Sequence, residues 1–184
     1  VAFYNTTMGE PTVVTMTSGS SSSNVTGGAT DYFPHGSIAN GDGVTRCPVL
    51  IPDRVQPTSA IVDGLSQTIL IDEVAMRPTL YVKGFRQTSP ATVTEPQWAT
   101  WAGHAQTRLC TYNEDGTVCD NTPLTADLAV NASNDAGIYA FHPAGANSLF
   151  CDGSVRFLSS KTAANIILGL ATRDGSEIIP GNSY

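Results

Sequence analysis

The segment 141–158, FHPAGANSLFCDGSVRFL, holds residue types that could do nucleophilic chemistry. His142 could act as a general base, Asp152 could orient it, and Ser154 could be the nucleophile. However, the chain has no G-x-S-x-G nucleophile elbow and no obvious oxyanion loop. The alternative is structural. Asp152-Gly153 predicts a tight hairpin turn in which Asp152 tolerates a positive φ, and His142 could bond a turn carbonyl or the Asp152 carboxylate. We favour this structural role and expect no catalytic residue and no enzyme.

A second polar cluster begins with Asp63-Gly64, which we interpret as another structural turn, and ends with Asp72 and Glu73. Neighbouring residues of a β-strand point to opposite faces of a sheet, so Asp72 and Glu73 cannot form an acid/base pair. Glu73 could instead pair with Arg77. We therefore interpret this cluster as structural.

Oxygen ligands for a metal ion are concentrated in residues 113–120, where Asn113, Asp115 and Asp120 could bind Ca²⁺. The string fails the EF-hand pattern, and a solvated acidic turn is the simpler interpretation. We expect no metal and no cofactor, with calcium at this turn as the alternative.

Three aromatic residues could form a ligand platform: Trp98, Trp101 and Tyr112. Stacked aromatic faces of this kind would suit a sugar. Trp residues three positions apart more often pack into the body of a loop-rich domain, so the site is an alternative to simple packing.

The chain has four cysteines and no Cys-x-x-Cys pair, and its three histidines are far apart, which argues against a structural zinc site. Cys110 and Cys119 flank TYNEDGTV, and a hairpin through its Asp-Gly turn would place them opposite each other. We predict this disulfide, with free buried thiols as the alternative. Cys47 and Cys151 are the remaining possible pair. A disulfide would imply an oxidising, extracytoplasmic location.

The composition excludes several partners. The net charge is −7, and the nine Lys and Arg residues are scattered singly. A phosphate backbone or an anionic lipid surface requires clustered basic residues, so we expect neither nucleic acid nor a membrane surface as partner. No segment approaches the roughly 20 apolar residues of a membrane span.

The hydrophobic pattern predicts an α+β fold dominated by short antiparallel strands and long loops. We expect a buried central strand at 68–71, strands at 138–141 and 148–158, and a short strand at 177–180. One C-terminal helix should begin with a cap at Ser159 or Ser160 and end at Asp174-Gly175. The Ser- and Gly-rich run 18–28 has little apolar surface, which predicts a mobile surface loop.

Three ordered blocks carry a family resemblance: residues 59–84, 133–158 and 171–179, with a weaker fourth at 30–36. Together they resemble the prepilin-type H-x9-DG domain family, whose members are bacterial exported proteins similar to type IV pilins and type II secretion pseudopilins. The resemblance implies one pilin-like globular domain over 1–184. It has a loop-rich part at 1–58, family blocks at 59–84 and 133–179, and a variable insertion at 85–132.

The resemblance implies a non-enzymatic, extracellular, cell-surface or periplasmic protein that assembles with itself or with other pilin-like subunits. Pilin-like proteins begin with a long apolar helix, so we expect this chain to start after that helix, its only membrane attachment. The alternative is a secreted binding module for a glycan or another surface ligand.

Overall fold

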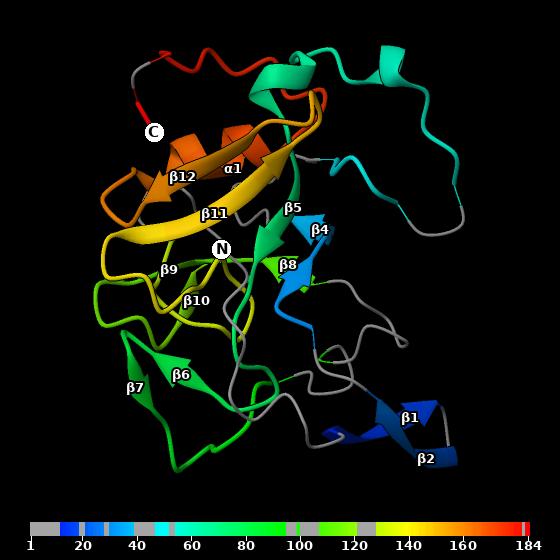
Figure 1. Cartoon of the computed structure of the whole chain (residues 1–184), viewed down its shortest axis with the longest axis vertical. Coiled ribbons are helices and arrows are strands. Elements are labelled where there is room, and N and C mark those ends of the chain that lie inside the picture. Colours follow the sequence, from blue (N-terminus) through cyan, green and yellow to red (C-terminus); the bar gives the residue numbers. More distant parts are fainter. Residues whose placement is uncertain are drawn as a thin grey trace.

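The largest sheet in the described part of the chain has four antiparallel strands in the order β12–β11–β5–β3 (Figure 1). The computed structural model describes residues 12–18, 21–27, 30–38, 47–51, 54–94, 99, 107–120, 128–181 and 183–184. Two-stranded pairs accompany this sheet: β1–β2, β6–β7 and β9–β10 are antiparallel, and β4–β8 is parallel. The strand-dominated α+β fold predicted from the sequence is confirmed.

The elements follow one another in this order: β1 (Thr12–Ser18), β2 (Ser21–Gly27), β3 (Tyr32–Phe33), β4 (His35–Ile38), the 3-10 turns Thr58–Ala60 and Leu65–Gln67, β5 (Ile69–Glu73), β6 (Tyr81–Val82), β7 (Phe85–Arg86), β8 (Thr107–Leu109), β9 (Thr111–Tyr112), β10 (Cys119–Asp120), β11 (Gly145–Phe150), β12 (Val155–Ser159) and α1 (Ala164–Ala171).

β11 and β12 form the hairpin predicted at 148–158, and their register places Leu149 opposite Val155. On its other edge β11 pairs with β5, where Leu149 lies opposite Ile71. β5 therefore lies between β11 and β3, which confirms the predicted central strand. Residues 138–141, predicted as a strand, contribute only isolated bridges at Ile138 and Tyr139.

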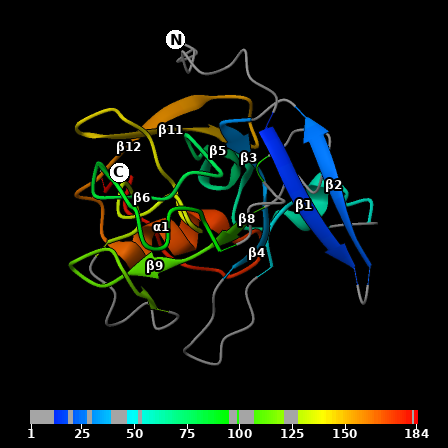
Figure 2. The same ribbon diagram turned by 90° about the horizontal axis from the view of Figure 1, so that it is seen from below.

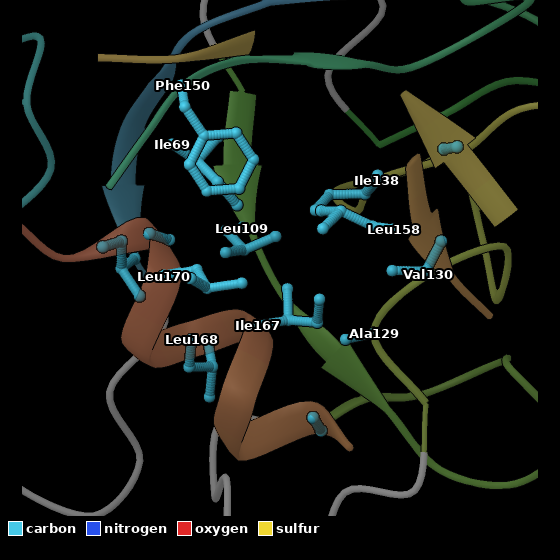
Figure 3. Close-up of a cluster of buried hydrophobic side chains, with 14 of the residues drawn as sticks. Ile69, Leu109, Ala129, Val130, Ile138, Phe150, Leu158, Ile167, Leu168 and Leu170 are labelled. Atoms are coloured by element: carbon cyan, nitrogen blue, oxygen red, sulfur yellow. The ribbon is translucent and has the colours of Figure 1, made fainter. Parts of the chain in front are cut away.

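Helix α1 packs its apolar side chains against the inner side of this sheet (Figure 3). Ile167 and Leu170 are fully buried together with Phe150 of β11 and Leu158 of β12, and Leu109 of β8 completes the contact. Burial of such side chains stabilises each by about 1.5–3 kcal/mol relative to exposure. The sheet and α1 thus share one core.

The ends of α1 differ from the prediction. Ser159 still belongs to β12, and its carbonyl accepts a hydrogen bond from Thr162 in an intervening turn, so neither Ser159 nor Ser160 can cap the helix. The residue before the helix is Ala163, which makes no side-chain cap. The helix ends at Ala171, before the predicted Asp-Gly stop, and 177–180 is irregular rather than a strand.

The prediction of a mobile loop at the Ser-rich run 18–28 is wrong in part. Ser21–Gly27 forms β2, which pairs with β1 along its whole length. Val14 lies opposite Val25 in this register. The Val and Thr residues of both strands favour extended backbone, which composition alone had hidden. In Figures 1 and 2 the β1–β2 hairpin lies to one side of the four-stranded sheet.

The predicted disulfide is confirmed. Cys110 and Cys119 are bonded with their Cα atoms 5.5 Å apart, and β9 and β10 form the predicted hairpin between them. Cys47 and Cys151 are free thiols, so the second proposed pairing is wrong. Their backbones are held by different segments: the Cys47 carbonyl accepts from Arg173, and the Cys151 amide donates to Thr68.

Within the described residues, no helix is both long and apolar enough to span a bilayer.

Replacement of both Cys110 and Cys119 by alanine is expected to lower the free energy of unfolding by about 2–3 kcal/mol, because the bridge restricts the unfolded chain. Urea denaturation followed by circular dichroism measures the change. The matched control is the Cys47→Ala/Cys151→Ala variant, which removes two thiols and no bond. Equal stability of the first variant and the wild type, or four reactive thiols in the oxidised, denatured protein, would contradict the expectation.

Candidate functional site

Two carboxylates at the end of β5 organise the polar centre of the sheet. Asp72 is fully buried and Glu73 is 3% exposed. Because successive strand residues point to opposite faces, the two side chains leave β5 in opposite directions. Each carboxylate has its own partners.

On the inner face, Asp72 lies between a serine and a histidine. The hydroxyl of Ser148, directly opposite on β11, donates to one carboxylate oxygen, and the other oxygen contacts Nε2 of His35. All three side chains are buried. We call these residues, Asp72, His35 and Ser148, the buried carboxylate cluster.

The buried carboxylate cluster contains the residue types of a hydrolase triad in a different order. In a triad the histidine lies between the carboxylate and the nucleophile and takes the nucleophile's proton. Here the carboxylate of Asp72 lies in the middle, so the Ser148 hydroxyl donates to Asp72 and not to His35. The arrangement satisfies a buried charge and leaves no activated nucleophile at Ser148.

On the outer face, Glu73 binds the segment that carries the predicted motif histidine. Its Oε2 accepts from the Asn147 amide at 3.0 Å and from the Asn147 side chain at 3.3 Å. Its Oε1 lies 3.6 Å from Nε2 of His142, and the His142 ring packs edge-on against Phe157, with centroids 6.0 Å apart. His142 thus lies beside Glu73, from a strand distant in sequence, and its Nε2 is also 3.5 Å from the side chain of Asn147.

The expected contact between His142 and Asp152 is wrong. His142 precedes β11 and Asp152 follows it, and the six residues of β11 separate its two ends by roughly 17 Å. The backbone carbonyl of His142 accepts from the side chain of Asn131 at 2.9 Å and from the Gly145 amide at 3.3 Å. The histidine and the Asp-Gly pair occupy opposite ends of the hairpin.

At the far end, Asp152 and Gly153 form the predicted turn with a different geometry. Gly153 has a φ of 84°, whereas Asp152 is not among the residues with positive φ. The Gly153 amide donates to Phe150 and the Phe150 amide donates to Ser154, the pattern of a three-residue hairpin loop closed by a left-handed glycine. The Asp152 carboxylate accepts from the amide and hydroxyl of Ser154, which lowers the pKa of Asp152.

The other predicted turn connects two parts of the chain. Gly64 has a φ of 98°, and the Asp63 carboxylate accepts from the amides of Gly175 and Ser176 at 2.9 and 2.8 Å. These contacts attach the segment that follows α1 to the segment that precedes β5.

A family model described as "Protein of unknown function (DUF1559)" matches residues 2–165. The chain belongs to the DUF1559 family. No curated protein and no solved structure matches it significantly. The matched range includes all of the described strands and the first residues of α1.

The candidate calcium ligands of the DUF1559 chain are engaged in their own turn. Asn113 Oδ1 accepts from the Val118 amide, and one Asp115 oxygen accepts from the amide and hydroxyl of Thr117. The side chain of Asp120 lies outside the described residues. In the part of the chain that the structure describes, no group of three or more His, Cys, Asp or Glu residues is arranged to hold a metal ion.

Tyr112 cannot belong to the aromatic platform that the sequence offered as an alternative to simple packing. Tyr112 is 2% exposed and its oxygen accepts from the Ala136 amide, so it cannot stack on a ligand. Burial raises the pKa of Tyr112 to about 12. Trp98 and Trp101 lie outside the described residues. Tyr112 belongs to a small core beside the disulfide.

Sequence reasoning missed His35, Ser148 and Asn147 as partners of the β5 carboxylates. They lie 37, 76 and 74 residues from the carboxylates that they contact. The sequence contained one signal of these partners. A carboxylate predicted in a buried strand requires hydrogen-bond donors, because burial of an unpaired charge costs a large free energy. That signal indicates that partners exist but not which residues they are.

Asp72→Ala is expected to lower the free energy of unfolding by about 3–5 kcal/mol, because it leaves the buried His35 and Ser148 without their acceptor. Asp72→Asn should lose less, since an amide oxygen can still accept from Ser148. Chemical denaturation measures both. The matched control is Asp152→Ala at the exposed turn, where the loss should be much smaller. Equal losses for Asp72→Ala and Asp152→Ala would contradict the role of the buried carboxylate cluster.

The burial of Cys151 can be tested through the pH dependence of its alkylation. Burial, aided by the negative charge of Asp152, raises the pKa of the Cys151 thiol to about 11. Only the thiolate is alkylated, so the iodoacetamide reaction of the folded chain should be slow at pH 8 and rise to a midpoint near pH 11. Peptide mass spectrometry follows the label at Cys151. In the urea-unfolded chain the reaction should have its midpoint at about pH 8.5. The same midpoint in the folded chain would contradict the raised pKa of Cys151.

Proposed function

We propose that this DUF1559 chain is the extracytoplasmic head of a non-enzymatic, pilin-like subunit that works through protein–protein assembly. Three observations support the proposal. The ordered blocks at 59–84, 133–158 and 171–179 resemble prepilin-type H-x9-DG proteins. The fold is a strand-dominated head with a C-terminal helix. The Cys110–Cys119 disulfide suits an oxidising compartment outside the cytoplasm.

The observation that carries the proposal is an apolar outer face on the four-stranded sheet. Val155, Leu149 and Ile71 lie side by side in register across β12, β11 and β5. Phe157 and Tyr32 extend this row on the same face. We call these residues the outer sheet face: Tyr32, Ile71, Leu149, Val155 and Phe157.

The outer sheet face is exposed where the inner face is not. Val155 is 66% exposed, Phe157 45% and Tyr32 44%, whereas α1 covers the inner side. A shallow apolar cavity of about 280 Å³ lies between Tyr32, Ile71, Leu149 and Val155. Clustered exposed apolar residues on a soluble domain mark sites of protein association. Assembly would bury this face at a protein interface.

The polar centre supports a non-enzymatic role. The Ser148 hydroxyl donates to a carboxylate rather than to a histidine, and His142 lies at the opposite end of the hairpin from Ser154. Each hydroxyl donates to a carboxylate, Ser148 to Asp72 and Ser154 to Asp152, whereas the nucleophile of a hydrolase triad donates to a histidine. These polar groups instead hold strands together.

A Val155→Glu/Phe157→Glu variant tests the proposal in the complete protein expressed by its native host. Two carboxylates on the outer sheet face should reduce assembly by about tenfold or more, as for central residues of an interface, while export and thermal stability remain near the wild type. Chemical cross-linking of surface fractions measures the assembled species.

The matched control is Ile178→Glu, which adds a carboxylate at a side chain that is 95% exposed on the segment after α1. It should assemble as the wild type does. Normal assembly of the Val155→Glu/Phe157→Glu variant would exclude the outer sheet face as the interface. A wild-type protein found only in the cytoplasm, with Cys110 and Cys119 reduced, would overturn the whole proposal.

A further inference from the structure

A second cavity, of about 340 Å³, opens beside His142 and is separate from the outer sheet face. It lies between the turn of the β6–β7 hairpin (Figure 1), which contributes Lys83 and Gly84, and the segments 128–131 and 139–143. Its volume falls within the range of about 300–1,000 Å³ that is usual for small-molecule sites. We infer that this cavity binds a single carboxylate group carried on a short apolar body, either a free acid or the C-terminal residue of a peptide.

Two residues that line this cavity, Lys83 and Tyr139, carry strong hydrogen-bond donors. An ammonium has three N–H bonds, and Lys83 uses one of them to donate to the backbone carbonyl of Glu114 at 3.0 Å. The Tyr139 oxygen accepts from the Gly84 amide at 3.0 Å, so its own proton can be donated elsewhere. Burial raises the pKa of Tyr139, which keeps that proton in place at neutral pH. A ligand that accepts hydrogen bonds fits these groups.

The side-chain amide of Asn131, which also lines the cavity, is already hydrogen-bonded within the protein. Asn131 Oδ1 accepts from the Ala140 amide, and its Nδ2 donates to the carbonyls of His142 and Gly145. This side chain therefore does not compete as an acceptor for the donors in the cavity. The positive charge of Lys83 then selects an anionic acceptor, of which a carboxylate is the smallest organic example.

The rest of the wall is apolar. Leu128, Val130 and Phe141 line the cavity, and Phe141 is 48% exposed. The Phe141 ring is held edge-to-face against Tyr81 and Tyr139, with centroids 5.0 and 5.6 Å apart. A fixed aromatic face beside an aliphatic wall suits a small apolar side chain next to the carboxylate.

The turn that presents Lys83 is fixed by the backbone. The Lys83 amide donates to the Ala132 carbonyl at 2.9 Å, and the following Gly84 amide donates to Tyr139. Lys83 itself has a φ of 48° and Gly84 a φ of 87°. A ligand therefore meets a donor whose main chain is already in position, which reduces the ordering cost of binding.

Nearby negative charges limit the ligand to one anionic group. Glu114 and Asp115 lie beside Lys83 at the mouth of a neighbouring shallow depression, and Glu73 contacts His142 on the side of the outer sheet face. The whole chain carries a net charge of −7. A polyanion such as a phosphate ester or nucleic acid would be repelled by these groups, whereas one carboxylate can be neutralised by Lys83.

Titration of the ¹⁵N-labelled chain by NMR tests this inference with three probes: N-acetyl-Ala-Leu, the same dipeptide with a C-terminal amide, and 4-methylpentanoate. The acid dipeptide should shift the amides of residues 83–84 and 139–143 and bind about tenfold more tightly than its amide, as expected for a charge-assisted contact. Lys83→Gln should remove that difference. Arg86→Gln, on the same hairpin but outside the cavity wall, should retain it.

Phe141→Ala provides a second, independent variant, which should weaken the acid and the amide equally because it removes the apolar wall. Binding by the dipeptide acid alone would identify a peptide C-terminus as the ligand, and binding by 4-methylpentanoate alone a free acid. Both results support the inference. Equal binding of acid and amide, acid binding unchanged in folded Lys83→Gln, or no shifts with about 10 mM probe, enough to saturate a site with a Kd of 1 mM, would overturn it.

Discussion

The buried charge of Asp72 is the constraint on which the rest of the sheet depends. Removal of a carboxylate from water costs several kcal/mol, and the cost is recovered only when donors are in place. Ser148 supplies one from β11 and His35 supplies the other from β4. Because β4 also pairs with β8, the contact to His35 joins the four-stranded sheet to the β4–β8 pair. The segments that meet at Asp72 are far apart in sequence, so their association must be cooperative.

Glu73 extends the same logic to the other face of the sheet. Its carboxylate accepts a hydrogen bond from the Asn147 amide and lies 3.6 Å from His142. These contacts hold the start of the β11–β12 hairpin against β5. One residue earlier, Asp72 holds the inner face of the same two strands. A one-residue slip of β5 would turn each carboxylate to the opposite face of the sheet, away from its present partners. The adjacent pair therefore fixes the register of β5 against β11.

Local signals allowed much of this fold to be predicted. The Asp-Gly turns, the β-branched run of β5 and the spacing of Cys110 and Cys119 all specify structure within a few residues, and the corresponding hairpins, strand and disulfide are present. The boundaries of α1 were wrong because Ser159 completes the hairpin before a helix can begin. The assignment of residues 21–27 to a loop failed because pairing with β1 outweighs a polar composition.

The candidate site was harder to predict, because its contacts are long-range. The motif that joins His142 to Asp152-Gly153 suggested that Asp152 is the partner of the histidine. The length of β11 separates the two residues, and the carboxylate beside His142 is that of Glu73. The same dipeptide also has different roles. Asp115 and Asp152 each bond the hydroxyl residue two positions later, whereas Asp63 binds amides more than 100 residues away, at Gly175 and Ser176. The dipeptide predicts a turn but not what its carboxylate contacts.

The polar groups that are hydrogen-bonded within the protein and the groups that line its surface occupy different parts of the fold. In the centre of the sheet, carboxylate, hydroxyl and amide groups bond one another, so they strengthen the fold and present little chemistry to a partner. What faces outward there is apolar, at Val155 and Phe157, while the cationic and aromatic groups of Lys83 and Phe141 face a separate cavity. His142 contacts Glu73 on one side and borders that cavity on the other. His142 therefore lies between the polar centre of the sheet and this cavity.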